Sequence, residues 1–186
     1  MKIFISGGVK NGKSFYAQRV AKKQQGCHSV PLYYIATMAS TDREDDQRIT
    51  RHRQEREGWG FTTIEQPRSI ESILEKCDHN GSFLLDSLTA LLANEMFTSD
   101  GDVNLGAYEH ISKGLAKILS NVSNIVIVSD YIYSDAMLYD PLTEQYRSIL
   151  AALDSMVAAN CDIVLEALYS QIIIHKGKDV AGIAVS

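Results

Sequence analysis

The stretch Gly7-Gly8-Val9-Lys10-Asn11-Gly12-Lys13-Ser14 lies near the start of the 186-residue chain and matches the pattern G-x-x-x-x-G-K-[ST]. An apolar run over residues 2–6 precedes it and predicts a strand, and residues 14–25 follow with helical spacing. A strand, a glycine-rich loop and a helix in this order form the context that a phosphate-binding loop needs. The sequence therefore predicts a P-loop nucleotide-binding protein.

The residue types in this loop suit the chemistry of phosphate binding. Gly7 and Gly12 let the backbone turn so that its N–H groups face phosphate oxygens, at the positive end of the following helix. Lys13 is expected to reach the terminal phosphates of ATP or GTP, and the hydroxyl of Ser14 is expected to bind Mg²⁺. Between them, Gly8, Val9, Lys10 and Asn11 complete the candidate nucleotide-binding loop. The alternative interpretation is a glycine-rich turn with a solvated lysine.

Length and composition are those of an ordinary globular protein, with 45% hydrophobic and 22% charged residues. We expect one domain spanning residues 1–186. The formal net charge of −5 argues against broad binding to nucleic acid. The N-terminal apolar run is too short for a signal peptide or a membrane span, so a cytoplasmic location is expected. The three cysteines have neither a metal-binding nor a disulfide-framework spacing.

Short apolar runs alternate with longer segments of helical spacing, which predicts an α/β fold with a mostly parallel sheet and helices on both faces. Strands are expected at residues 2–6, 32–36, 61–65, 83–86, 125–129, 163–168 and 171–175. Helices are expected at residues 14–25, 42–57, 69–76, 88–97, 105–120 and 141–159. Only Tyr169 and Ser170 separate the last two strands, so these should form an antiparallel edge.

Two aspartates end apolar strand-like runs and could assist a bound metal ion. Asp86 follows Phe83-Leu84-Leu85, and Asp130 ends the run that starts at Ile125. A carboxylate at the carboxyl end of a buried strand can hold Mg²⁺ beside the phosphate loop. We favour Asp86, because a helical segment follows it directly. The alternative for each aspartate is a helix cap or a solvated strand end.

A basic helical face is expected within residues 42–57, where Arg48, His52 and Arg56 recur at intervals of four. Arginine binds phosphate in a bidentate manner, and two neighbouring cations favour the neutral, nucleophilic form of the imidazole. His52 is therefore a candidate for covalent catalysis. By spacing alone, a solvated and salt-bridged helix is the more common explanation, since the segment is also rich in acidic residues.

Together these blocks resemble the adenosylcobinamide kinase/adenosylcobinamide-phosphate guanylyltransferase family. The resemblance rests on the loop at residues 7–14, on Tyr34-Ile35-Ala36-Thr37, and on Arg48-Ile49 with the later His52, Arg56 and Trp59. It continues through Leu85-Asp86-Ser87-Leu88-Thr89 and Asn94. All the blocks lie in the family's order within about the first hundred residues.

The resemblance implies a RecA-like fold, a homotrimer and two reactions on a corrinoid. The enzyme would first phosphorylate a hydroxyl of the cobinamide side chain with ATP or GTP. It would then transfer GMP from GTP to that phosphate through a guanylyl-histidine intermediate on His52. The resemblance also implies that Thr37, Arg48, Arg56 and Asp86 join the phosphate loop in nucleotide binding, and that Ser14 and Asp86 hold Mg²⁺.

The second half of the chain departs from the family pattern. An Asn-Glu pair and a glycine-bearing loop usually follow the fifth strand, whereas this chain has Asp130-Tyr131-Ile132-Tyr133-Ser134-Asp135. Two alternatives therefore stay open, a different small-molecule kinase and a nucleotide-binding regulatory paralogue without catalysis. No base-specific motif such as NKxD distinguishes ATP from GTP.

Overall fold

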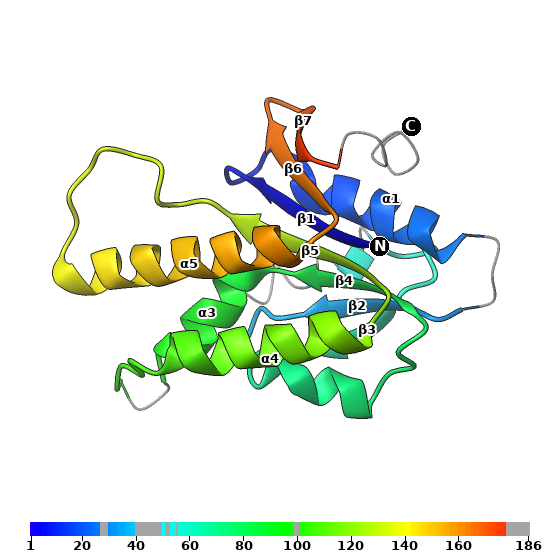
Figure 1. Ribbon diagram of the computed structural model, residues 1–186, viewed down its shortest axis with the longest axis horizontal. Helices are drawn as coiled ribbons and strands as arrows, with labels where there is room; N and C mark the ends of the chain where they lie inside the picture. Colours follow the sequence, from blue (N-terminus) through cyan, green and yellow to red (C-terminus); the bar gives the residue numbers. More distant parts are fainter. Residues whose placement is uncertain (27–29, 40–49, 51–52, 55, 99–100, 178–186) are drawn as a thin grey trace.

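The computed structural model describes residues 1–26, 30–39, 50, 53–54, 56–98 and 101–177. Within them seven strands form one sheet in the order β3-β2-β4-β5-β1-β6-β7 (Figure 1). All neighbouring pairs are parallel except β6 and β7, which are antiparallel. The strands are β1 (Lys2–Gly7), β2 (Leu32–Ala36), β3 (Thr62–Glu65), β4 (Ser82–Asp86), β5 (Asn124–Asp130), β6 (Ile163–Leu168) and β7 (Gln171–Lys176). The mostly parallel sheet and its antiparallel edge are confirmed.

Helices connect the strands close to the expected positions. They are α1 (Lys13–Gln25), α3 (Leu88–Met96), α4 (Ala107–Asn121) and α5 (Pro141–Asn160), together with the 3₁₀ helix η1 (Ile70–Glu75). Proline fits the first position of α5, where its missing N–H has no helical partner, and the Asp140 side chain caps the N–H groups of Leu142 and Thr143. The helix expected over residues 42–57 lies mostly outside the described residues, although Arg53 and Gln54 are helical.

The helix expected over residues 69–76 is the six-residue 3₁₀ helix η1. Ile70 and Ile73 are both fully buried and lie three positions apart. With three residues per turn, a 3₁₀ helix places such a pair on one face, here against α4. The expected helix is therefore present, and its geometry is that of a 3₁₀ helix.

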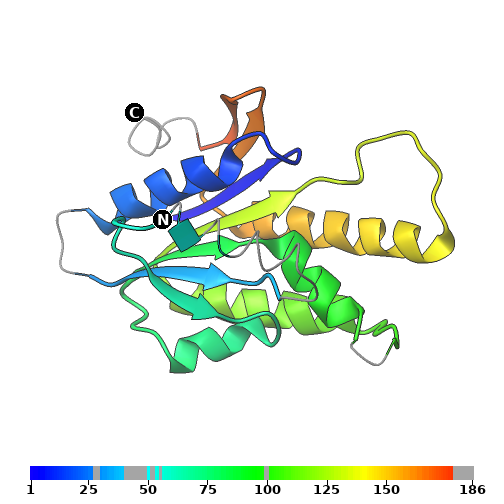
Figure 2. The ribbon, with the colours of Figure 1, turned by 180° about the vertical axis from the view of Figure 1, so that it is seen from behind.

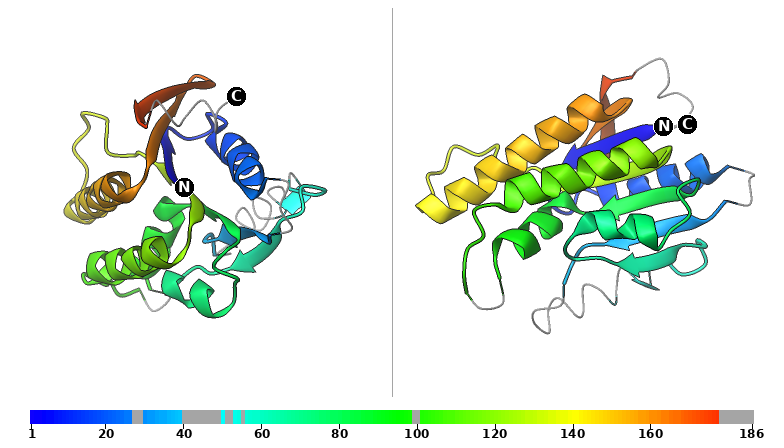
Figure 3. Two further views of the ribbon diagram at one scale, coloured as in Figure 1. Left: turned by 45° about the vertical axis from the view of Figure 1, so that its right-hand side comes forward. Right: turned by 60° about the horizontal axis from the view of Figure 1, so that its bottom comes forward.

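The two faces of the sheet have separate apolar cores. Along β1, Phe4 packs on one face with residues of α3, α4 and α5, whereas Ile3 and Ile5 pack on the other face with residues of α1. Figure 3 shows α1 on one side of the sheet and the α4–α5 pair on the other. Burial on both faces explains why the inner strands are continuous apolar runs rather than alternating ones.

The carboxyl ends of β1, β4 and β5 meet at one edge of the sheet, and the phosphate loop leaves β1 there. The loop over residues 131–140 also leaves this edge and extends well beyond the sheet before α5 begins (Figures 1 and 2). The topology thus brings the phosphate loop, Asp86 and Asp130 to one end of the molecule. Among the described residues, no helix is long and apolar enough to cross a membrane.

Candidate nucleotide-binding site

The loop between β1 and α1 turns back on itself through two residues in the left-handed region. Gly12 has φ 85° directly before α1, and Lys10 has φ 59°. Gly7 is required for a different reason, because a Cβ atom there would lie 2.6 Å from the Ala167 carbonyl oxygen. Asn11 occupies the remaining space and donates its side-chain amide to that oxygen. The loop is therefore fastened to the end of β6.

Lys13 is the first residue of α1 and is buried, with 6% of its surface exposed. Its ammonium group turns back toward its own loop, where it donates to the Gly8 carbonyl oxygen at 3.0 Å and to the carboxylate of Asp130. Ser14, the next residue, is half-buried in the first turn of the helix. A buried cation thus faces the loop, as phosphate binding requires.

The carboxylate that meets Lys13 belongs to Asp130 rather than to Asp86, the aspartate favoured from sequence. β5 is the direct neighbour of β1, and its register pairs Gly7 with Asp130. Asp86 ends β4, one strand farther from β1, and accepts a hydrogen bond of 2.7 Å from the Tyr34 hydroxyl. Both aspartates lie at the carboxyl edge of the sheet. Ser14 and Asp86 carry oxygen atoms, which are the ligands that Mg²⁺ prefers. Their assignment to the metal stays a prediction.

Thr37 is fully buried, and its hydroxyl is already engaged by the backbone of Ser87. The hydroxyl donates to the Ser87 carbonyl oxygen at 2.8 Å and accepts from the Ser87 N–H at 2.7 Å. The Asn94 side chain donates to the Thr37 carbonyl oxygen at 2.6 Å. Three of the residues that support the family resemblance therefore tie the ends of β2 and β4 together, and the role of Thr37 in nucleotide binding stays a prediction.

Arg56 is 7% exposed, and its guanidinium lies over the ring of Tyr34. This cation–π contact holds the segment around residue 56 against β2. Arg48 and His52, the other members of the expected basic face, lie outside the described residues.

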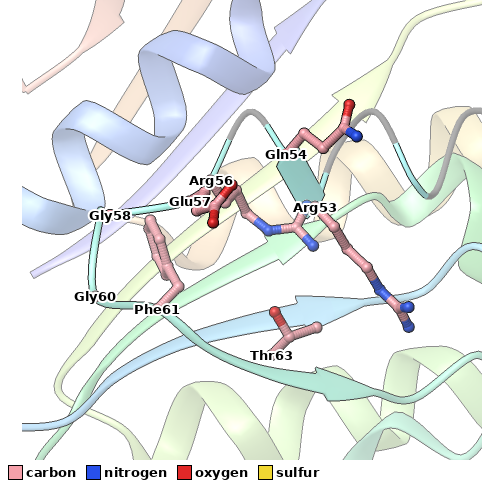
Figure 4. Close-up of a pocket in the computed structure, with 8 residues that line it drawn as sticks. All are labelled: Arg53, Gln54, Arg56, Glu57, Gly58, Gly60, Phe61 and Thr63. Carbon is pink, nitrogen blue, oxygen red and sulfur yellow. The ribbon is translucent and has the colours of Figure 1, made fainter.

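An open pocket of about 610 Å³ lies between the residues around Arg56 and the outer strand β3 (Figure 4). Arg53, Arg56 and Glu57 line one side, and Phe61 and Thr63 come from the β3 side. Phe61 also packs edge-on against Tyr34, with ring centroids 5.9 Å apart. The pocket adjoins the Arg56–Tyr34 contact rather than the mouth of the phosphate loop.

Behind the end of β5 lies a buried acidic group that sequence reasoning missed. Asp154 of α5 is 3% exposed and accepts a hydrogen bond of 2.8 Å from the Tyr133 hydroxyl. Burial raises the pKa of Asp154 to about 6, and the negative charge of Asp130 contributes to the increase, whereas the hydroxyls of Ser129 and Tyr133 oppose it. The sequence signal that could have identified Asp154 is its position among apolar residues of the helical segment 141–159.

The residues that follow Asp130 form an ordered loop around Arg147. This arginine is 6% exposed and donates to the carboxylates of Asp135 and Glu144, each at 2.8 Å, and to the Met137 carbonyl oxygen at 3.2 Å. The tip of the loop nevertheless presents apolar side chains, with Leu138 93% exposed. A buried arginine thus fixes a loop whose tip faces solvent.

A strand, a loop with Lys10 and Gly12 in the left-handed region and a helix that begins at a buried lysine define a P-loop NTPase fold, and the sheet has the RecA-like arrangement. A family model described as cobinamide kinase / cobinamide phosphate guanyltransferase matches residues 3–169, and the chain belongs to this family. The fold is also similar to that of a KaiC-like protein from Pyrococcus horikoshii, with a TM-score of 0.51 at 12% identity over 96% of this chain and 79% of that one.

Two curated relatives are similar over most of their length. The bifunctional adenosylcobalamin biosynthesis protein CobP of Pseudomonas aeruginosa is 28% identical over 165 residues, which cover 88% of this chain and 91% of the relative. The corresponding protein CobU of Escherichia coli is 25% identical over 171 residues, which cover 86% and 91%. The family expected from the motifs is thus confirmed, and the match continues through the divergent second half.

Proposed function

We propose that this chain phosphorylates a side-chain hydroxyl of a cobinamide and then transfers GMP from GTP to the new phosphate. The observation that supports this most directly is the phosphate loop with its buried Lys13, in a chain whose family match spans residues 3–169. The two relatives are named as bifunctional adenosylcobalamin biosynthesis proteins. The residues of the loop suit both steps, because each step breaks a phosphate–oxygen bond of a bound nucleotide.

In the kinase step, the acceptor hydroxyl attacks the γ-phosphorus of ATP or GTP, the bond to the β-phosphate oxygen breaks, and the hydroxyl proton leaves to solvent or a base. The loop N–H groups and Lys13 stabilise the charge that develops on the phosphate oxygens. Ser14 and Asp86 would hold Mg²⁺, which neutralises phosphate charge when bound. Rate enhancement then comes mainly from positioning and electrostatics.

In the transferase step, a ring nitrogen of His52 attacks the α-phosphorus of GTP, and pyrophosphate leaves as the phosphoramidate forms. The phosphate of the acceptor then attacks the same phosphorus and releases the histidine. Arg48 is proposed to bind nucleotide phosphate beside His52, and Arg56 and Thr37 are proposed to contribute from the adjoining segments. These assignments rest on the family resemblance of the blocks that contain them.

Labelled GTP tests the two steps separately. Protein incubated with GTP labelled at the α-phosphate and run on a denaturing gel should retain acid-labile label, whereas label at the γ-phosphate should be lost. His52→Ala should abolish the retained label and preserve phosphorylation of cobinamide. His110→Ala is the matched control, since this histidine is exposed on α4. Retained label in His52→Ala would show that another residue is the nucleophile.

One observation favours a second candidate, a kinase of the same scaffold that acts on a different acceptor. The loop over residues 131–140 replaces the family's Asn-Glu pair and glycine-bearing turn, and it begins at the site residue Asp130. If this loop contacts the acceptor, its aromatic residues reshape the acceptor pocket and leave the phosphate site intact. Phosphate transfer from ATP or GTP to cobinamide at the rate of the relatives would exclude this candidate.

A further inference from the structure

The contact between Lys13 and Asp130 neutralises the positive charge with which Lys13 would bind a phosphate group. Among the described residues, the Lys13 ammonium has two hydrogen-bond partners, Asp130 and the Gly8 carbonyl oxygen. The lysine side chain is 7% exposed and the aspartate side chain 24%, so solvent screens the pair only weakly. The cation of the phosphate loop is therefore already paired with an internal anion.

The backbone around Asp130 is fixed on two sides, which keeps its carboxylate close to the loop. The Asp130 N–H donates to the Thr89 hydroxyl at 2.9 Å, and the N–H of the next residue, Tyr131, donates to the Gly7 carbonyl oxygen at 3.3 Å. Thr89 is held in turn by the Tyr146 hydroxyl, which donates to its carbonyl oxygen at 2.7 Å. These hydrogen bonds hold the strand end beside the loop, whereas the carboxylate can rotate about its side-chain bonds.

We propose that Asp130 is an internal competitor for the nucleotide phosphates, a positioning residue that pairs with Lys13 and must release it when phosphate binds. A phosphate group in the loop offers Lys13 a more highly charged partner, but it also faces the carboxylate that it displaces. Like charges side by side at partly buried positions are costly. The inference requires only that the loop binds nucleotide, so it is independent of the acceptor and of His52.

This role predicts opposite effects of one substitution on affinity and on stability. Asp130→Asn keeps the size of the side chain and removes its charge. The dissociation constant for inorganic tripolyphosphate, measured by calorimetry in EDTA, should fall about tenfold or more. The melting temperature of the ligand-free variant should fall by roughly 5–10 °C, because Lys13 is left buried without its anion.

Three controls separate competition from other roles of Asp130. Glu75→Gln removes one negative charge from the exposed surface of η1 and should leave both quantities unchanged. In a Lys13→Met background, Asp130→Asn should no longer lower the melting temperature, because the cation that it left unpaired is gone. If Asp130→Asn alone fails to fold, millimolar tripolyphosphate should restore folding by replacing the lost anion.

Equal or weaker binding of tripolyphosphate by a folded Asp130→Asn protein overturns the proposal. Unchanged binding in EDTA together with weaker binding in Mg²⁺ also overturns it, because Asp130 would then serve the metal rather than compete with the phosphate. A melting temperature that falls equally in the Lys13→Met background overturns the proposed pairing. Wild-type protein that binds tripolyphosphate but lacks cobinamide kinase activity would contradict the proposed function and leave this inference standing.

Discussion

The guanidinium carbon of Arg56 lies 3.6 Å from the centre of the Tyr34 ring, while the hydroxyl of the same tyrosine donates to Asp86. Tyr34 thus links an arginine of the segment that follows His52 to an aspartate at the carboxyl edge of the sheet. The ring is 3% exposed, so the contact with the cation is shielded from solvent. Tyr34 therefore contacts both Arg56 and the proposed metal ligand Asp86.

Tyr34→Phe separates the two functions of this tyrosine. The phenylalanine ring keeps the stack with Arg56 and loses the hydrogen bond to Asp86, so the free energy of unfolding should fall by only about 1 kcal/mol. If Asp86 assists the metal, the Mg²⁺ concentration for half-maximal activity should change severalfold. Tyr34→Leu should cost more stability, because the cation–π contact is lost as well. Equal Mg²⁺ dependence in all three proteins would argue against a metal role for Asp86.

Lys13→Ala should weaken GTP binding by about 10- to 100-fold, because it removes a charged hydrogen-bond donor from the phosphate site. Turnover should be nearly abolished, since the same charge stabilises the transition state. Calorimetric titration with GTP measures the first effect. Lys10→Ala is the comparison, because this lysine belongs to the same loop but is exposed, so its loss should weaken binding less. Unchanged affinity and turnover in Lys13→Ala would exclude the assignment.

Asp154→Asn should stabilise the protein near neutral pH. The folded-state pKa of Asp154 is raised to about 6, so between about pH 4 and 6 the folded chain binds protons that the unfolded chain has released. The wild-type group therefore disfavours folding above pH 6, and this penalty disappears as the pH falls toward 4. Asparagine keeps an acceptor for the Tyr133 hydroxyl without a charge.

Denaturant unfolding at several pH values measures this effect. At pH 7.5 the free energy of unfolding of Asp154→Asn should exceed that of the wild type by up to about 3 kcal/mol. The difference should vanish near pH 4, where the wild-type carboxyl group is protonated. Glu75→Gln, which changes an exposed carboxylate, should show no such dependence. A constant difference at all pH values would mean that packing, rather than charge, separates the two proteins.

Arg147→Lys should loosen the loop over residues 131–140 without disturbing the phosphate site. Lysine cannot reproduce the planar fork that binds both Asp135 and Glu144, nor the stack of Arg147 on Tyr139. Limited proteolysis within the loop should become faster, while the affinity for GTP changes less than about twofold. Arg19→Lys on the exposed side of α1 provides the control. Loss of turnover with the acceptor would show that the ordered loop serves acceptor binding.

The sequence was sufficient to predict the phosphate loop, because Gly7, Gly12 and Lys13 are constrained by local geometry and chemistry. The inner strands were equally clear, since burial on both faces produces continuous apolar runs. The contact of Lys13 with Asp130 rather than Asp86 was not predictable in the same way. It depends on β5 lying beside β1, and local patterns contain no information on the order of strands. Likewise, the helical pattern over residues 69–76 did not distinguish the 3₁₀ geometry of η1 from that of an α-helix.

The anchoring of Asn11 to the Ala167 carbonyl oxygen determines when the phosphate loop loses its conformational freedom. A glycine-rich segment without such an anchor would sample many backbone conformations and would become ordered only on contact with the nucleotide. Here β6 holds the loop in place as part of folding. Because the phosphate loop is anchored in this way, little of the binding energy of a nucleotide should be needed to order it. The rate of association should then depend mainly on diffusion and on the exchange of the ionic partners of Lys13.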